Sequence, residues 1–124
     1  MPYAAQWTNE GFEVSFWGIV SSGDIEAVNN EFTGNLRFET VRYALWDMSR
    51  ITTLAMEDAD VEYAAATDKG ASGIRSNLKG AIIVSEGPVR EFVEQYLAVS
   101  AELDNPWETR LFLDQETARE WLGC

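Results

Sequence analysis

The side chains in this sequence that could do chemistry are almost all carboxylates. The chain contains 21 Asp and Glu residues, nine Lys and Arg residues, one cysteine and no histidine. Without histidine it lacks the usual general base and the Ser/His/Asp and Cys/His arrangements. Cys124, the last residue, has no base to activate it. A carboxylate pair of the glycosidase kind is not excluded, but among so many acids some pair will lie close by chance. We therefore predict that the protein is not an enzyme.

Metal and cofactor sites are not predicted either. An acidic series in the middle of the chain could suggest calcium, but its spacing does not match a calcium-binding loop, and a solvated helix face explains it better. The series consists of Asp58, Asp60, Glu62 and Asp68. The stretch 70–73 lacks the lysine and the preceding strand of a phosphate-binding loop. We expect no metal and no cofactor.

The net charge of −12 limits the partners. Nucleic acids and anionic membrane surfaces are bound mainly through Lys and Arg, so neither is expected. No apolar run approaches the roughly 18 residues of a spanning helix, and the start of the chain does not read as a signal peptide. We expect a cytoplasmic protein without stable membrane insertion, whose charge serves solubility or a basic protein partner.

Strand-like and helix-like segments alternate along the chain. The predicted strands are 12–20, a short edge strand 36–38, 43–48, 78–84 and 109–113. The first predicted helix begins after an N-cap at Ser22 and ends at a left-handed Gly34. Two more helices are predicted over 57–71 and 88–103, and a last one follows a cap at Asp114. This order implies crossover connections. We predict one α/β domain, 1–124, with a mixed, largely parallel sheet of about four to five strands and about four helices packed on it.

Two periodic patterns bear on the interior. In the strand 12–20, Phe12, Val14 and Phe16 alternate onto one face, and Trp17 and Ile19 are expected to be covered on the other. In the helix 57–71, one line of side chains runs through Val61, Ala64, Ala65 and Asp68.

The segment 43–52 resembles part of a known family. Its apolar strand, which runs into Asp47, Met48 and Ser49, is similar to the strand and Asp-Leu-Ser turn of STAS domains, the fold of the anti-sigma-factor antagonist SpoIIAA. The segments 14–20 and 112–122 are similar to the SpoIIAA-like branch of small bacterial proteins. The resemblance in element order covers most of the chain and implies a SpoIIAA-like fold.

In STAS domains a phosphorylated serine at a helix N-terminus switches partner binding. The matching positions here, 55–58, have no hydroxyl, so no phosphoester can form on them. The resemblance leaves Asp47, Ser49, Thr52 and Glu57 as a candidate switch region. Glu57 would act there as a permanent anion at a helix start, and an ordinary first-turn acid is the alternative.

Aromatic residues suggest a second region. Trp17, Trp46, Phe92, Tyr96 and Trp107 are candidates to line an apolar pocket or an interface, and core packing is the alternative for each. The pocket would lie between the sheet and the helix 88–103. The SpoIIAA-like branch also resembles lipid-transfer domains of the CRAL-TRIO/Sec14 type in fold, which implies a carrier of apolar molecules.

Three functions remain open from the sequence. The preferred one is a non-enzymatic STAS-like module of bacterial signalling or regulation that binds a protein partner or forms a homodimer. The second is a carrier of a hydrophobic small molecule or lipid in a pocket between sheet and helices. The third is an unrecognised carboxylate-based enzyme.

Overall fold

A five-stranded sheet organises the molecule, in a computed structural model that describes residues 1–124. The strands lie side by side in chain order: β1 Tyr3–Trp7, β2 Gly11–Ser21, β3 Tyr43–Ala55, β4 Lys79–Ile83 and β5 Glu108–Phe112. The helices are α1 Ser22–Thr33, α2 Asp58–Ala71, α3 Pro88–Glu102 and α4 Gln115–Leu122, and a short 3-10 helix, η1, spans Leu36–Glu39. The predicted α/β class is confirmed.

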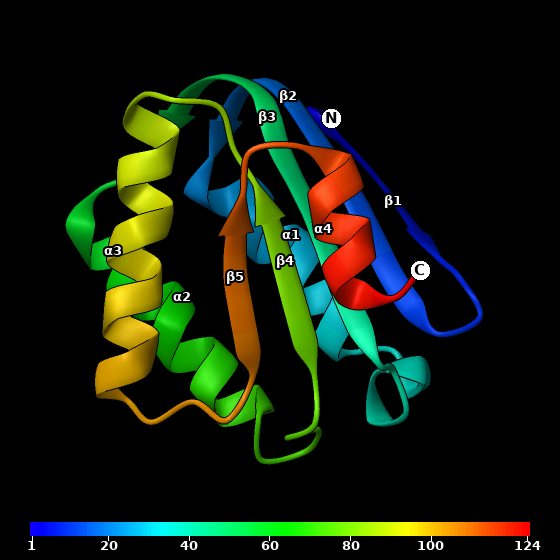
Figure 1. Ribbon diagram of the computed structural model, residues 1–124. Helices are drawn as coiled ribbons and strands as arrows, with labels where there is room; N and C mark the ends of the chain where they lie inside the picture. Colours follow the sequence, from blue (N-terminus) through cyan, green and yellow to red (C-terminus); the bar gives the residue numbers. More distant parts are fainter.

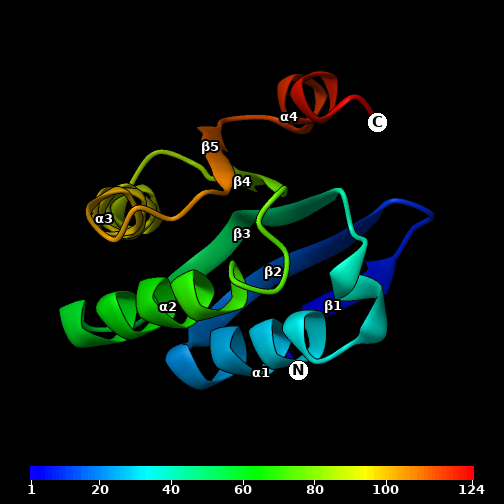
Figure 2. The ribbon, with the colours of Figure 1, turned by 90° about the horizontal axis from the view of Figure 1, so that it is seen from below.

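The sheet is mixed, with one antiparallel edge. β1 pairs antiparallel with β2, and β2 to β5 run parallel to one another. Each parallel connection passes through a helix, as crossover connections require. α1, α2 and α3 cover one face of the sheet and α4 covers part of the other (Figures 1 and 2).

The face under α1, α2 and α3 holds an aromatic core. The ring of Phe12 in β2 lies 4.9 Å from that of Phe32 in α1, which in turn lies 4.9 Å from Phe38 in η1. All three side chains are fully buried. Burial of such large apolar surfaces is the main favourable term that holds α1 to the sheet.

The opposite face is only half covered. Residues of β3 and β4 pack against Ala118 and Leu122 of the short α4. Trp17 and Ile19 of β2 lie beyond its reach and are 37% and 71% exposed. The prediction that these two side chains are covered is therefore wrong, because the only helix on this face sits over β3, β4 and β5.

The predicted edge strand 36–38 is also wrong. This segment forms η1, whose start is capped by the Asn35 side chain accepting the backbone N–H of Arg37 at 2.9 Å. The edge strand is instead β1, which hydrogen-bonds to β2 and was not predicted.

The helix ends follow capping chemistry, with two shifts from the prediction. Ser21, not Ser22, caps α1 and accepts the backbone N–H of Asp24. Gly34 is not left-handed, with φ −85°. A glycine fits there because a Cβ would lie 2.7 Å from the carbonyl oxygen of Asn30. Asp114 caps α4 as predicted, with its carboxylate accepting the Thr117 N–H at 2.7 Å.

Candidate functional site

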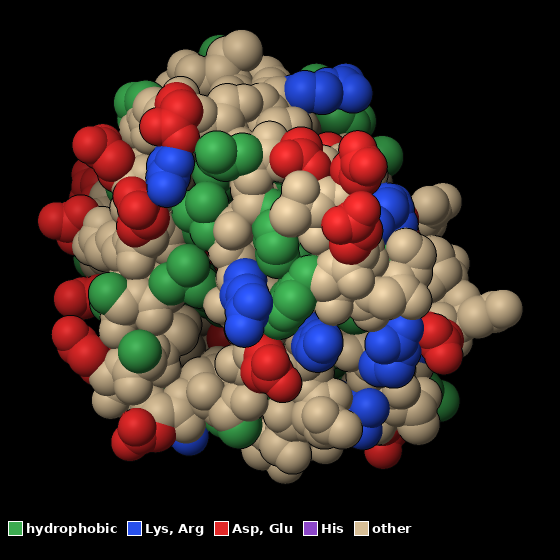
Figure 3. Space-filling view, in the orientation of Figure 1, with side chains coloured by type: hydrophobic (Ala, Val, Ile, Leu, Met, Phe, Trp, Pro, Cys, Tyr) green, Lys and Arg blue, Asp and Glu red, His purple; other side chains and the backbone are tan.

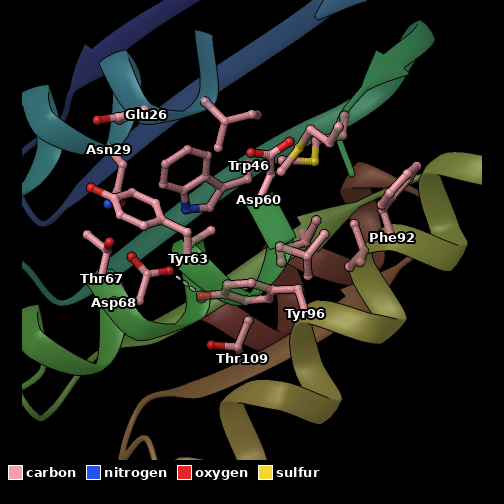
Figure 4. A pocket seen from close by; sticks show the side chains of 18 of the residues that line it. Glu26, Asn29, Trp46, Asp60, Tyr63, Thr67, Asp68, Phe92, Tyr96 and Thr109 are labelled. Atoms are coloured by element: carbon pink, nitrogen blue, oxygen red, sulfur yellow. Dashed lines mark hydrogen bonds between the residues drawn. The ribbon is translucent and has the colours of Figure 1, made fainter. Parts of the chain in front are cut away.

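A cavity of about 150 Å³ lies between the sheet and the three helices α1, α2 and α3. Of the 24 residues that line it, 16 are hydrophobic. Trp46 rises from β3, Ile82 from β4, and Phe92 and Tyr96 from α3 (Figure 4). The cavity therefore occupies the position predicted for an apolar pocket, between the sheet and the helix that begins at Pro88.

The local sequence explains both the walls and the space between them. Phe92 and Tyr96 are four residues apart on α3, so they lie one turn apart on the same face of the helix. Small residues also line the cavity, Ala64 of α2 and Ala44 and Gly80 of the sheet. Small side chains among large ones leave space between the packed elements.

Part of the lining is exposed. Glu26 of α1 is exposed and Tyr63 of α2 is 60% exposed, whereas Phe92 and Tyr96 of α3 are half-buried. Of these four lining residues, the more exposed two therefore lie on α1 and α2.

One polar pair stands in this apolar lining. The hydroxyl of Tyr96 donates a hydrogen bond to Oδ2 of Asp68 in α2, and the two side chains point toward each other in Figure 4. The other carboxylate oxygen, Asp68 Oδ1, is buried and has no hydrogen-bond partner. Burial raises the pKa of Asp68 to about 6, although Tyr96 and Asn29 each lower it. Burial is also the main cause that raises the pKa of Tyr96 well above its usual value, and the negative charge of Asp68 raises it further.

The charges around the cavity are all negative. Three carboxyl groups line it, those of Glu26, Asp60 and Asp68, and no Lys or Arg does. Asp60 accepts the backbone N–H of Glu57 at 2.9 Å at the start of α2, so part of its charge is already engaged. Asp68 is the one carboxyl of the three with a buried, unpartnered oxygen.

Four of the five aromatic candidates from the sequence line this cavity: Trp46, Phe92, Tyr96 and Trp107. The fifth, Trp17, is on the opposite face of the sheet, where its ring lies 5.9 Å from the guanidinium of Arg50. Its assignment to the pocket is wrong, because alternation along β2 points it away from α1, α2 and α3.

Sequence reasoning missed the functional interest of Asp68. The series from Asp58 to Asp68 was interpreted as a solvated helix face, yet Asp68 points inward. The available signal was its position on the line through Val61, Ala64 and Ala65, three and four residues apart. A carboxyl on the apolar line of a helix indicates a buried acid.

The switch-region candidates are only partly brought together. Asp47 Oδ1 accepts two hydrogen bonds from Ser49, from the backbone N–H at 3.0 Å and from the hydroxyl at 2.6 Å. Asp47 Oδ2 accepts a third from the side-chain amide of Gln115 in α4 at 2.9 Å. These bonds outweigh burial and lower the pKa of Asp47. Thr52 is exposed further along β3 and Glu57 precedes α2, and neither hydrogen-bonds to Asp47.

A second tyrosine–carboxylate pair lies on the α4 face. Tyr43 donates to Oε2 of Glu13 at 2.7 Å. Arg119 of α4 donates to both oxygens of the same carboxylate, at 2.8 and 3.1 Å. The hydrogen bond from Arg119 holds the pKa of Glu13 below its usual value, against burial and together with the bond from Tyr43. Burial raises the pKa of Tyr43 to about 12.

In the view of Figure 3, blue basic groups gather below the position of α4, and red acidic groups lie over the helix itself. Arg42 and Lys79 donate to the carbonyls of Leu122 and Trp121 at the end of α4, at 3.1 and 3.4 Å. The guanidinium of Arg110 lies 5.0 Å from the Trp121 ring. These cations suit the negative end of the helix dipole, and they lie on the face opposite the cavity.

Among solved structures, the chain is similar to an uncharacterised protein of the DUF3478 family from Shewanella loihica PV-4, whose crystal structure has a SpoIIAA-like fold. The two superpose with a TM-score of 0.55 at 19% sequence identity, covering 97% of this chain and 91% of that one. The fold is SpoIIAA-like. Neither a protein-family model nor a curated protein sequence matches the chain.

The SpoIIAA-like fold implied by the resemblance of the segment 43–52 is thus confirmed. No helix of the structure combines the length and apolar character needed to cross a bilayer. No group of three or more Cys, Asp or Glu side chains is placed to hold a metal ion.

Proposed function

We propose that the protein binds a small apolar molecule in the cavity between the sheet and helices α1, α2 and α3, and does not transform it. The observation that carries this proposal is the cavity itself, with its largely hydrophobic lining. Ligand pockets are typically apolar spaces with a few placed polar groups. The Asp68–Tyr96 pair supplies such groups here.

The energetics favour an occupied cavity. Lining atoms beside an unfilled space lose the dispersion contacts that a packed core supplies. A ligand that fills the space would recover these contacts and raise the free energy of unfolding.

The volume restricts the ligand. A cavity of about 150 Å³ admits a molecule about the size of benzene, whereas drug-sized ligands occupy pockets of about 300–1,000 Å³. A compact ring or a short chain fits better than a whole lipid. The proposal therefore keeps the carrier idea and narrows its cargo.

The polar pair suits recognition of a ligand. The Tyr96 hydroxyl donates to one oxygen of Asp68, and the other oxygen has no hydrogen-bond donor. An acid and a tyrosine in an apolar lining can orient a ligand, so we assign the pair to recognition.

A matched pair of substitutions on α2 tests the proposal. Ala64 lines the cavity, and Ala66, on the same helix, is exposed. Ala64→Leu should fill the space and abolish binding of benzyl alcohol, while Ala66→Leu should leave it unchanged. Saturation-transfer NMR on the three proteins measures this. No binding by the unsubstituted protein, or equal binding by Ala64→Leu, overturns the proposal.

One observation favours a second function, that of a protein-interaction module. Trp17 and Ile19 form an exposed apolar strip on the uncovered part of the sheet, a feature typical of contact surfaces. Sedimentation over a range of concentrations tests self-association through this strip. A dimer that Trp17→Ser dissociates would support it, and a monomer throughout would exclude the homodimer.

A further inference from the structure

We propose that the ligand is an organic cation, a compact apolar group bearing an amine, and that Asp68 binds its ammonium group. This inference rests on the function proposed above and specifies the chemical class of the ligand. It depends on three features of the cavity: an unpartnered oxygen, the sign of the charges and the arrangement of the rings.

The first feature is the free hydrogen-bonding capacity of Asp68. Its Oδ1 is buried without a donor, while Oδ2 accepts the Tyr96 hydroxyl. Buried polar atoms are nearly always paired, and an unpaired carboxylate oxygen is especially costly. Asp68 lines the cavity, so a small rotation of its side chain would turn this covered oxygen to a donor group on the ligand. An ammonium group supplies both the donor and the opposite charge.

The second feature is the one-sided charge of the lining. Glu26, Asp60 and Asp68 face the cavity, and no Lys or Arg does. A ligand carboxylate or phosphate would therefore be buried beside like charges with no cation to pair with. The lining excludes anionic ligands, such as fatty acids, and favours cations.

The third feature is the set of aromatic rings close to Asp68. Trp46, Tyr63 and Tyr96 line the same cavity as Asp68, and Figure 4 draws their rings in the same part of it. A cation within about 6 Å of a ring face is attracted by the ring quadrupole, most strongly for Trp. The same rings supply apolar contact for the body of the ligand. An amine with an aromatic or short aliphatic body satisfies both requirements.

Three ligands of the same shape test the inference: benzylamine, benzyl alcohol and benzoate, titrated by calorimetry at pH 7.5. Benzylamine should bind about ten- to a hundredfold more tightly than benzyl alcohol, which is the expected range for a hydrogen bond to a charged partner. Benzoate should bind most weakly. Asp68→Asn should remove the preference for the amine while still binding the alcohol.

The control variant is Glu31→Gln, which removes the same charge from an exposed position of α1 outside the cavity. It should keep the full preference for the amine. If Glu31→Gln lowers that preference as much as Asp68→Asn does, the effect is one of overall charge and the inference fails. If Asp68→Asn is not folded, as judged by the loss of cooperative unfolding, the comparison of the three ligands on the unsubstituted protein still tests the preference for the amine.

The possible failures are distinguishable. Equal binding of amine and alcohol, or tightest binding of benzoate, overturns the cationic ligand but leaves the apolar binding function standing. Failure of all three ligands to bind contradicts the proposed function as well.

Discussion

Two tyrosine hydroxyls donate to two carboxylates on opposite faces of the sheet, and the pKa values of the two carboxyl groups are shifted in opposite directions. On the α4 face, Tyr43 and Arg119 both bind Glu13, and its pKa is lowered. In the cavity, Tyr96 binds Asp68 without a cation, and its pKa is raised to about 6. The tyrosine is common to both pairs, so the difference comes from the deeper burial of Asp68 and from the cation that only Glu13 has.

The comparison shows what the cavity lacks. On the α4 face the chain itself supplies the positive charge, through bidentate contacts from Arg119. In the cavity the corresponding position is open to a ligand. A buried acid without its counter-ion destabilises the folded protein at neutral pH, which a bound cation would correct.

The largest expected effect is the pH dependence caused by Asp68. Its folded pKa of about 6 lies above the ordinary value of 3.8. Between these two pH values the folded protein keeps a proton on Asp68 that the unfolded chain has released. The contribution of Asp68 to stability is therefore lost as the pH rises from about 4 to about 7, by up to about 3 kcal/mol.

Asp68→Asn should remove this dependence, and urea unfolding at pH 4.5 and pH 7.5 measures it. Relative to the unsubstituted protein, the free energy of unfolding of Asp68→Asn should rise by on the order of 2 kcal/mol between the two pH values. Glu31→Gln should show no such rise. A constant difference between Asp68→Asn and the unsubstituted protein would contradict the buried, unpaired state of Asp68.

A smaller effect follows from removing the cation on the α4 face. Arg119→Met leaves Glu13, whose side chain is 14% exposed, without a counter-ion. We expect a loss of about 1–2 kcal/mol at pH 7.5, less than for a wholly buried pair because the Arg119 side chain is 36% exposed. Urea unfolding measures the loss.

The pH dependence of that loss has the opposite sign to that of Asp68. The pKa of Glu13 is lowered from 4.5 in the folded protein. The pair therefore stabilises the folded protein fully above pH 4.5, and this contribution is lost as the pH falls below 4.5 through the lowered pKa. The deficit of Arg119→Met should narrow over the same pH range. Arg90→Met breaks pairs with Glu86 and Glu94, whose side chains are 73% and 57% exposed against 14% for Glu13. Because both carboxylates stay hydrated, this variant should lose less than about 1 kcal/mol. Equal losses in the two variants would mean that the Glu13–Arg119 pair contributes no more than a surface pair.

The smallest effect separates the two tyrosines. Tyr96→Phe should raise the pKa of Asp68 above about 6, because the Tyr96 hydrogen bond lowers it. Tyr43→Phe should leave Glu13 ionised at neutral pH, because Arg119 is the larger influence on its pKa. Carbon-detected NMR titration of both carboxyl groups checks this. An unchanged pKa of Asp68 in Tyr96→Phe would mean that the tyrosine does not bind the carboxylate.

Much of the fold was predictable because its signals are local. The alternation of Phe12, Val14 and Phe16 predicted β2, and Pro88 marked the start of α3. The spacing of Phe92 and Tyr96 placed both on one face of α3, and both line the cavity. Periodicity and capping depend on neighbours within a few residues, so a sequence shows them directly.

The misassigned segments involve contacts between distant parts of the chain. The segment 36–38 has strand-forming residues, but the core takes up Phe38 through η1, and β1 occupies the edge of the sheet instead. Trp17 is exposed because α4, about a hundred residues later, is too short to reach it.

The sequence by itself determined the composition of the site: a chain without histidine, rich in acids and aromatic residues, with alternating strands and helices. Only the tertiary structure decided which of the acids matters. Asp68 and Tyr96 are 28 residues apart on different helices, and they meet because α2 and α3 pack side by side. Arg119 reaches Glu13 across 106 residues, while no base reaches Asp68. The charge state of a carboxyl depends on its burial and its partners, and both are set by how the helices cover the sheet.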